Sequence, residues 1–264
     1  MTLAGRARLH VTAPLMVVSA AAWVLIAFEP TGMSDHCSMA NMQASPLTSL
    51  TTWMGFDLVA QWALAWASML AAMMVPMLAA PLRHVCERSF TRRRLRSGVL
   101  FVAGYTAIWM VTGGILLPLT QGIKQCVPGP WVPVALVTVT AIMWQFSPMK
   151  QQCLNRNHAH SELAAFGWAA DRDALRFGWN HGLWCVGSCW ALMMLPMLVS
   201  RGHFAVMAVV TAWLFCERLD RPMPPRWRLR GPARAVRMIF AQLRMQVQRI
   251  AGSVQMKFGE QQDC

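Results

Sequence analysis

Sulfur-bearing side chains recur at every fourth position in one apolar stretch, residues 181–197, which reads HGLWCVGSCWALMMLPM. Cys185, Cys189, Met193 and Met197 therefore fall on one face of a helix. Thiolates and thioethers are soft ligands that favour Cu(I), whereas zinc sites use thiolate, imidazole or carboxylate ligands. The stretch predicts one wall of a soft-metal site, and the alternative is that its sulfurs only pack against neighbouring helices.

A second sulfur-rich stretch, WALAWASMLAAMMVPM, lies far away in the sequence, at residues 62–77. Met69, Met73 and Met77 follow helical spacing and are candidates to face the first stripe. Pro76 frees a backbone carbonyl in this helix, and a neighbouring helix or a cavity must satisfy that group. The alternative for the methionines is that they fill irregular gaps in a helical core.

A third group of candidate ligands follows residues 131–146, in the segment MWQFSPMKQQCLNRNHAH. Pro148 is expected to break the helix there, which leaves Met149 and Cys153 on a ligand-bearing elbow. The alternative is a capped helix end with a basic loop, in which His158 and His160 are surface residues.

The elements that must position these residues are membrane helices. The chain has 264 residues, of which 56% are hydrophobic and 13% charged. This balance predicts an all-α, polytopic bundle of about six spans. The expected spans are Ala13–Phe28, Phe56–Ala80, Val99–Leu119, Trp131–Phe146, Gly182–Ser200 and Phe204–Phe215. AMMVPM in the second span recurs as LMMLPM in the fifth, a weak sign of inverted halves with helices interrupted at the two prolines.

Charge sets the expected orientation. Of the 24 Lys and Arg residues, only Lys124 and Arg201 fall outside when the N-terminus is placed in the cytoplasm. This asymmetry predicts both termini inside a bacterial inner membrane. Because topology explains the basic excess, we expect no nucleic-acid partner. The same topology places Cys185, Cys189, Cys153, Met73 and Met77 at one depth, in the cytoplasmic half of the bilayer or just below it.

The expected outer loop, residues 29–55, contains MSDHCSMANM, and five soft or borderline ligands crowd into this segment: Met33, His36, Cys37, Met39 and Met42. One interpretation is an outer capture site for a soft metal. The equally weighted alternative is a flexible loop whose Cys37 forms a disulfide with Cys126, the only other cysteine placed outside.

We divide the chain into a membrane domain, residues 1–218, and a cytoplasmic tail, residues 219–264. The tail joins a Pro-rich linker to a predicted basic amphipathic helix in which Val236, Phe240 and Leu243 begin an apolar stripe. Such a helix fits the anionic surface of the inner leaflet. The same spacing also allows a coiled coil or a partner-docking helix.

Several classes of chemistry are excluded or disfavoured. The spans hold no Asp or Glu away from their ends, which argues against hard-metal and carboxylate proton-relay sites. No GxSxG, HExxH or glycine-rich phosphate loop occurs, so a hydrolase has no support. We therefore expect metal binding rather than catalysis. The main alternative is an accessory subunit of a larger membrane complex, and a copper or thiol redox enzyme ranks third.

PMKQQCL, GLWCVGSCWALM and AMMVPM together resemble the motifs of a bacterial family of predicted metal-binding integral membrane proteins, catalogued as a domain of unknown function. The resemblance spans roughly residues 60–218 and implies six characteristic positions: Pro148, Lys150, Cys153, Cys185, Cys189 and Met193. The family pattern has cysteines where this chain has Asn157 and Ser188. Two of its thiols are therefore missing here.

The combined prediction is an integral membrane protein that binds Cu(I) through cysteine and methionine for copper handling or transport. Its expected ligands come from Cys185, Cys189, Cys153, Met73, Met77, Met69, Met193 and Met149.

Overall fold

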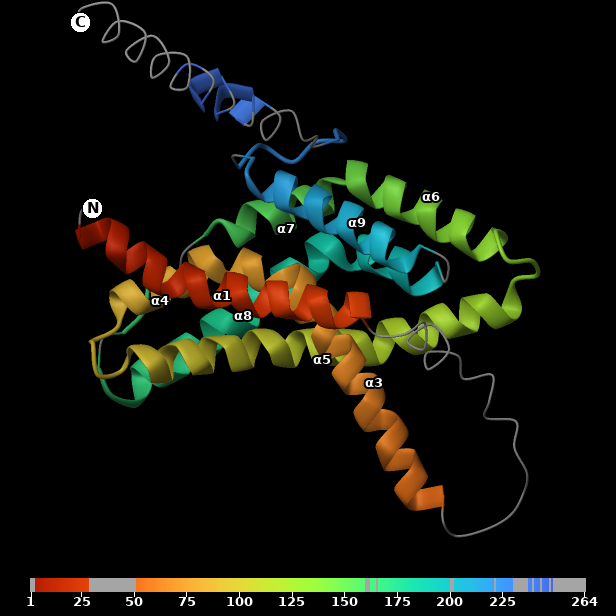
Figure 1. Cartoon of the computed structure of the whole chain (residues 1–264), viewed down its shortest axis with the longest axis horizontal. Helices are drawn as coiled ribbons and strands as arrows, with labels where there is room; N and C mark the ends of the chain where they lie inside the picture. The colour runs from red at the N-terminus through yellow and green to blue at the C-terminus, as the bar shows by residue number, and fades with distance from the viewer. Residues whose placement is uncertain are drawn as a thin grey trace, which may run out of the picture.

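The structure is a computed structural model that describes residues 3–28, 51–159, 162–164, 166–199, 202–220, 222–229 and, with gaps at 239, 243 and 247, 237–248. Side chains are not described for residues 3–11, 51–59 and 61. The ordered elements are α1 (Leu3–Phe28), α3 (Thr51–Met74), the short 3₁₀ helix η2 (Val75–Leu78), α4 (Ala79–Arg88), α5 (Arg94–Cys126), α6 (Val132–Phe146), α7 (Pro148–Asn157), α8 (Gly167–Leu198) and α9 (His203–Arg218). The described part of the chain is all-helical, as predicted (Figure 1).

Three helical stretches are long and apolar enough to cross a membrane: Trp62–Arg88, Arg94–Cys126 and Gly167–Leu198. A fourth is reached if the bent pair α6 and α7, whose axes meet at 66°, counts as one span. The apolar part of α1, Thr12–Phe28, is shorter. The expected outer loop lies outside the described residues, and the predicted C-terminal helix is described only in short helical pieces between residues 237 and 248.

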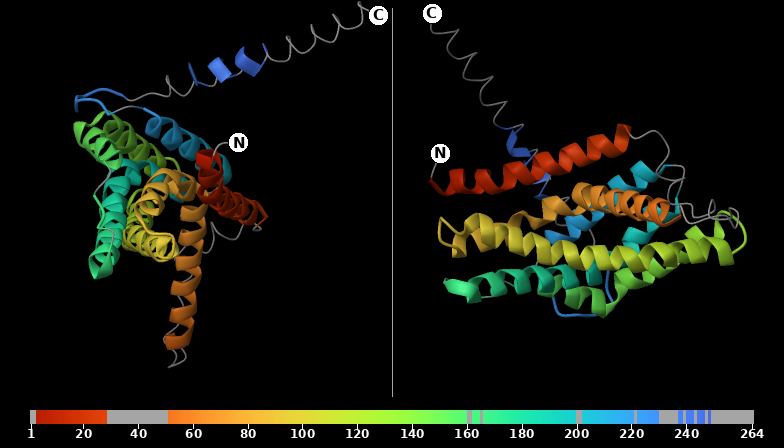
Figure 2. Two further views of the ribbon diagram at one scale, coloured as in Figure 1. Left: turned by 90° about the vertical axis from the view of Figure 1, so that its left-hand side faces the viewer. Right: turned by 90° about the horizontal axis from the view of Figure 1, so that it is seen from below.

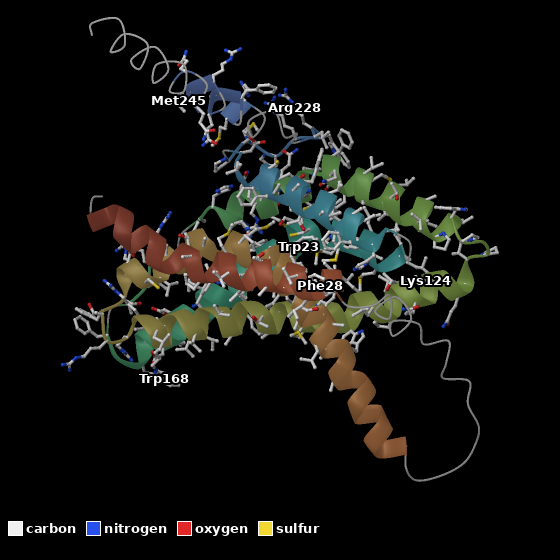
Figure 3. The ribbon with its side chains drawn as sticks, viewed as in Figure 1. Trp23, Phe28, Lys124, Trp168, Arg228 and Met245 are labelled. Carbon is white, nitrogen blue, oxygen red and sulfur yellow. The ribbon has the colours of Figure 1, made fainter. Side chains whose placement is uncertain are left out.

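Pro76 interrupts the second expected span, as its sequence predicts. It lies in η2, the 3₁₀ turn that joins α3 to α4. Because Pro76 has no N–H, the carbonyl of Ala72 loses its helical partner. Ser19 Oγ and Trp23 Nε1 of α1 donate to that carbonyl at 2.8 and 3.0 Å. A neighbouring helix thus satisfies the freed group, and Figure 3 shows Trp23 near the middle of the molecule.

The second predicted interruption is wrong, because α8 continues past Pro196 to Leu198. The carbonyl of Pro196 itself lies 2.6 Å from Nδ1 of His203, the first residue of α9. The two similar hexapeptides therefore have different backbones, and the described structure gives no support to an inverted pair of broken helices.

Glycines let α5 and α8 approach closely where residues 101–108 pack against residues 175–182. A methyl group at Gly178 of α8 would collide with the carbonyl of Phe101, and one at Gly104 of α5 would collide with the carbonyl of Leu175. One turn further along, Gly182 lies against Tyr105. Residue numbers rise together on both helices, so α5 and α8 run in the same direction, side by side in both views of Figure 2. Close packing at small residues is typical of helices in a membrane.

The fourth expected span ends at Phe146, and Pro148 breaks the helix there, as predicted, by starting α7. Ser147 caps α7 by accepting a hydrogen bond from the backbone N–H of Met149 at 3.2 Å. The turn directs Lys150 into the protein, where its Nζ lies 2.8 Å from both carboxylate oxygens of Glu217 in α9. Both side chains are almost fully buried, and Trp213 Nε1 donates to the same carboxylate at 2.7 Å. This ion pair fixes the end of α9 against α7.

Candidate metal centre

Cys185 and Cys189 form the centre of the candidate site, on the sulfur stripe that the spacing predicts. Their sulfurs are 3.8 Å apart, and both side chains are buried, with exposures of 0% and 1%. The distance is far longer than a disulfide bond of about 2.05 Å. An ion bonded to thiolates at about 2.3 Å, the length of a Zn–S bond, bridges sulfurs up to about 4.6 Å apart. The pair is therefore spaced to share one ion after little rearrangement.

Two polar side chains from other helices reach Cys185. The hydroxyl of Tyr105 in α5 lies 3.2 Å from its sulfur, and Nη2 of Arg218 at the end of α9 donates to the same sulfur at 2.8 Å. Ser188 lies beside the pair, with Oγ 3.4 Å from the sulfur of Cys189. A guanidinium next to a sulfur compensates the negative charge of a thiolate, which is the form that binds metal.

The methionines of the prediction lie in the same core as these cysteines. Met73 and Met193 are fully buried, and Met69 and Met77 are at most 8% exposed. The cluster of buried residues that contains Cys185 and Cys189 includes all four. Helices α5 and α9 each contact both α3, which carries Met69 and Met73, and α8. The thioethers of α3, η2 and α8 thus belong to the same buried core as the thiol pair.

Cys153 lies on a different side of α8. It is 8% exposed, and its sulfur fills the notch at Gly187, where an added Cβ would lie 2.7 Å away. Gly187 is two residues from each cysteine of the pair, which at about 100° per residue places it roughly on the opposite face of the helix. Cys153 thus lies level with Cys185 and Cys189, as the topology predicts, but it is not brought to their face.

Met149, the last of the predicted inner ligands, is not brought into the core at all. Its side chain is 54% exposed on the first turn of α7. The five outer candidates, Met33, His36, Cys37, Met39 and Met42, lie outside the described residues, and Cys126, the predicted partner of Cys37, is exposed at the end of α5. Within the described ranges, no three His, Cys, Asp or Glu side chains gather closely enough to hold a metal ion. A metal at Cys185 and Cys189 therefore needs thioether ligands or a coordination number of two.

Asn157 and Ser188, the positions at which the resembled family has cysteines, face one another. Nδ2 of Asn157 lies 3.5 Å from Oγ of Ser188, and Asn157 is one turn beyond Cys153 on α7. A path of neighbouring side chains thus runs from Cys153 through Asn157 and Ser188 to Cys189. The two missing thiols fall on the path that joins Cys153 to the pair.

The sequence prediction did not include Tyr105 or Arg218. Composition could have drawn attention to Tyr105, because it is the single tyrosine in the chain. Position could have drawn attention to Arg218, because it ends the last apolar helix. Neither signal names a partner, because Tyr105 and Cys185 are 80 residues apart and Arg218 and Cys185 are 33 apart.

A comparison with protein families matches residues 63–241 to PpoB2, a family described as a copper chaperone. The matched region contains Met69, Met73 and Met77, together with Cys153, the Cys185–Cys189 pair and Arg218. Searches of curated proteins and of solved structures gave no match. Because the family model covers more than half of the chain, the protein belongs to the PpoB2 family of copper chaperones.

Proposed function

We propose that this protein is integrated in the bacterial inner membrane and binds Cu(I) through Cys185 and Cys189. The observation that carries the proposal is the buried pair of sulfurs 3.8 Å apart beside a guanidinium. Soft sulfur ligands favour Cu(I) among biological metals. The copper chaperone family supports copper as the cargo. Met193 and a methionine of α3 or η2 supply thioether ligands to the bound ion.

The proposed topology has six spans with both termini in the cytoplasm. The parallel run of α5 and α8 supports it, because the α6–α7 pair then returns the chain across the membrane once. Lys124 and Trp168, proposed to lie on opposite sides of the membrane, lie at opposite ends of the bundle in Figure 3. In this arrangement α1 and α9 are short spans, and the basic tail lies on the anionic inner leaflet.

Metal loading of the full-length protein in detergent tests the site. We expect wild-type protein, loaded anaerobically with Cu(I) and desalted, to retain copper that the Cys185→Ser, Cys189→Ser variant does not retain. A Cys126→Ser variant is the matched control, since this cysteine is exposed at the end of α5. Affinity falls as pH falls, because thiols release protons when they bind metal. Equal copper in the wild type and the double variant would show that the ligands lie elsewhere.

A further inference from the structure

Arg218 brings a positive charge to the buried thiol pair, and no carboxylate in the described part of the chain forms an ion pair with it. Its guanidinium donates to Cys185 at 2.8 Å. Among the described residues, the ion pairs do not include Arg218, and the adjacent Glu217 is engaged by Lys150. A charge inside a membrane protein needs a counter-charge close by. The sulfurs of the candidate site are in position to supply it.

Two further donors surround the same space. The hydroxyl of Tyr105 contacts the sulfur of Cys185. One turn along α5, Trp109 is fully buried, and its indole N–H faces the sulfur of Cys185 without forming a hydrogen bond of standard geometry among the described residues. Buried donors without acceptors are uncommon and costly. The side chains of α5 and α9 around the cysteines, Tyr105, Trp109 and Arg218, are therefore suited to stabilise a negative charge on sulfur.

The charge of a filled site depends on the ion. Cysteines that bind metal do so as thiolates. Two thiolates and a monovalent ion carry one net negative charge, which Arg218 neutralises. Two thiolates and a divalent ion are already neutral, so the half-buried guanidinium of Arg218 is then left beside the buried sulfurs without a negative partner. We infer that Arg218 selects a monovalent soft cation over a divalent one at Cys185 and Cys189, an inference that rests on the proposed function.

The observed contacts are compatible with a bound metal. A thiolate sulfur has several lone pairs, so Cys185 can coordinate an ion and still accept hydrogen bonds from Arg218 and Tyr105. Hydrogen bonds to ligating sulfurs tune the properties of metal sites. The Lys150–Glu217 pair, one residue earlier on α9, fixes the helix end from which Arg218 extends. Arg218 is thus a charge-balancing and positioning residue held in place by a separate ion pair.

The experiment compares Cu(I) and Zn(II) binding to purified full-length variants in detergent, by competition with a chromogenic chelator for each ion. Arg218→Gln and Arg218→Met remove the charge, and the second suits an apolar core if the first does not fold. Arg218→Lys keeps the charge. Arg228→Gln is the matched control, because Arg228 is an exposed arginine on the segment after α9, where Figure 3 labels it.

We expect the ratio of Cu(I) affinity to Zn(II) affinity to fall by at least about tenfold in the neutral variants, the scale of losing a buried charge partner. Arg218→Lys should restore most of the ratio, and Arg228→Gln should leave it unchanged. A neutral variant that folds and keeps the wild-type ratio would overturn the selection by charge while leaving Cu(I) binding intact. Wild-type protein that binds no Cu(I) would instead overturn the proposed function, and with it this inference.

Discussion

Buried cysteines lie at two faces of α8, and the two faces differ in the groups that contact the cysteine sulfurs. On one face, Cys185 and Cys189 lie beside Tyr105 and Arg218, whose hydroxyl and guanidinium groups contact the sulfur of Cys185. On the other, the sulfur of Cys153 fills the notch left by Gly187. All three cysteines are buried at a similar level of the bundle. The sulfur of the first face has polar partners, whereas that of the second packs against a helix backbone.

The difference teaches that sulfur at membrane depth is not by itself a ligand set. The electrostatic surroundings decide which thiol can lose its proton and hold a cation. The face with Arg218 has such surroundings. The Cys153 face instead belongs to the helix packing that holds α7 in place, together with the Lys150–Glu217 pair. Four experiments on substituted proteins test whether the first face is the ligand face and the second a packing face.

Lys150→Met should have the largest effect, a loss of folding stability. It leaves Glu217 buried without the ammonium that lies 2.8 Å from its carboxylate. Breaking a buried ion pair in this way costs about 3–5 kcal/mol. Thermal unfolding in detergent measures the loss, and the Lys150→Met, Glu217→Gln variant should recover much of it. An unchanged melting temperature in the single variant would contradict a structural role for the Lys150–Glu217 ion pair between α7 and α9.

Cys189→Ser and Cys153→Ser should separate the two faces by Cu(I) affinity. Losing an outer-shell partner of a metal costs about 10–100-fold, so losing a ligand at Cys189 should exceed about a hundredfold. Cys153→Ser should change affinity by no more than about threefold, because its sulfur packs at Gly187 rather than in the pair. Competition with a Cu(I) chelator measures both. Similar losses would show that Cys153 moves to join the site.

Gly187→Ala should have a moderate effect on stability alone. The added methyl group would lie 2.7 Å from the sulfur of Cys153. Overpacking of this kind costs about 1–3 kcal/mol, and we expect the lower end because a single sulfur must shift. Adding Cys153→Ala should relieve the clash. Copper affinity that falls together with stability, and recovers with it, would contradict the separation of the two faces.

The double substitution Asn157→Cys, Ser188→Cys should have the smallest effect, a gain in Cu(I) affinity. The two residues lie 3.5 Å apart between Cys153 and Cys189, so thiols there extend the ligand set toward α7. We expect Cu(I) affinity to rise roughly threefold, since soft ligands are added beside an existing pair. The Asn157→Ala, Ser188→Ala variant is the control without thiols. No gain over that control would mean that the packing face cannot be converted.

The two Met-Pro hexapeptides show where local sequence stops deciding structure. Pro76 turns its helix into a 3₁₀ segment because Ser19 and Trp23 of α1 are present to satisfy the freed carbonyl of Ala72. Pro196 lies two residues from the end of α8, where the helix has little left to interrupt. Proline removes one hydrogen bond in both places, and the neighbouring elements determine how the backbone responds.

The sequence by itself determined the all-helical class, the apolar segments, the break at Pro148 and the sulfur stripe of Cys185 and Cys189. These features follow from composition, residue type and helical spacing, which are local properties. Only the tertiary structure decided that Arg218 and Tyr105 meet Cys185, and that Cys153 lies on another face. Those contacts join helices distant in the sequence, and the rotation of each helix about its axis depends on packing, here on glycines such as Gly178 and Gly187.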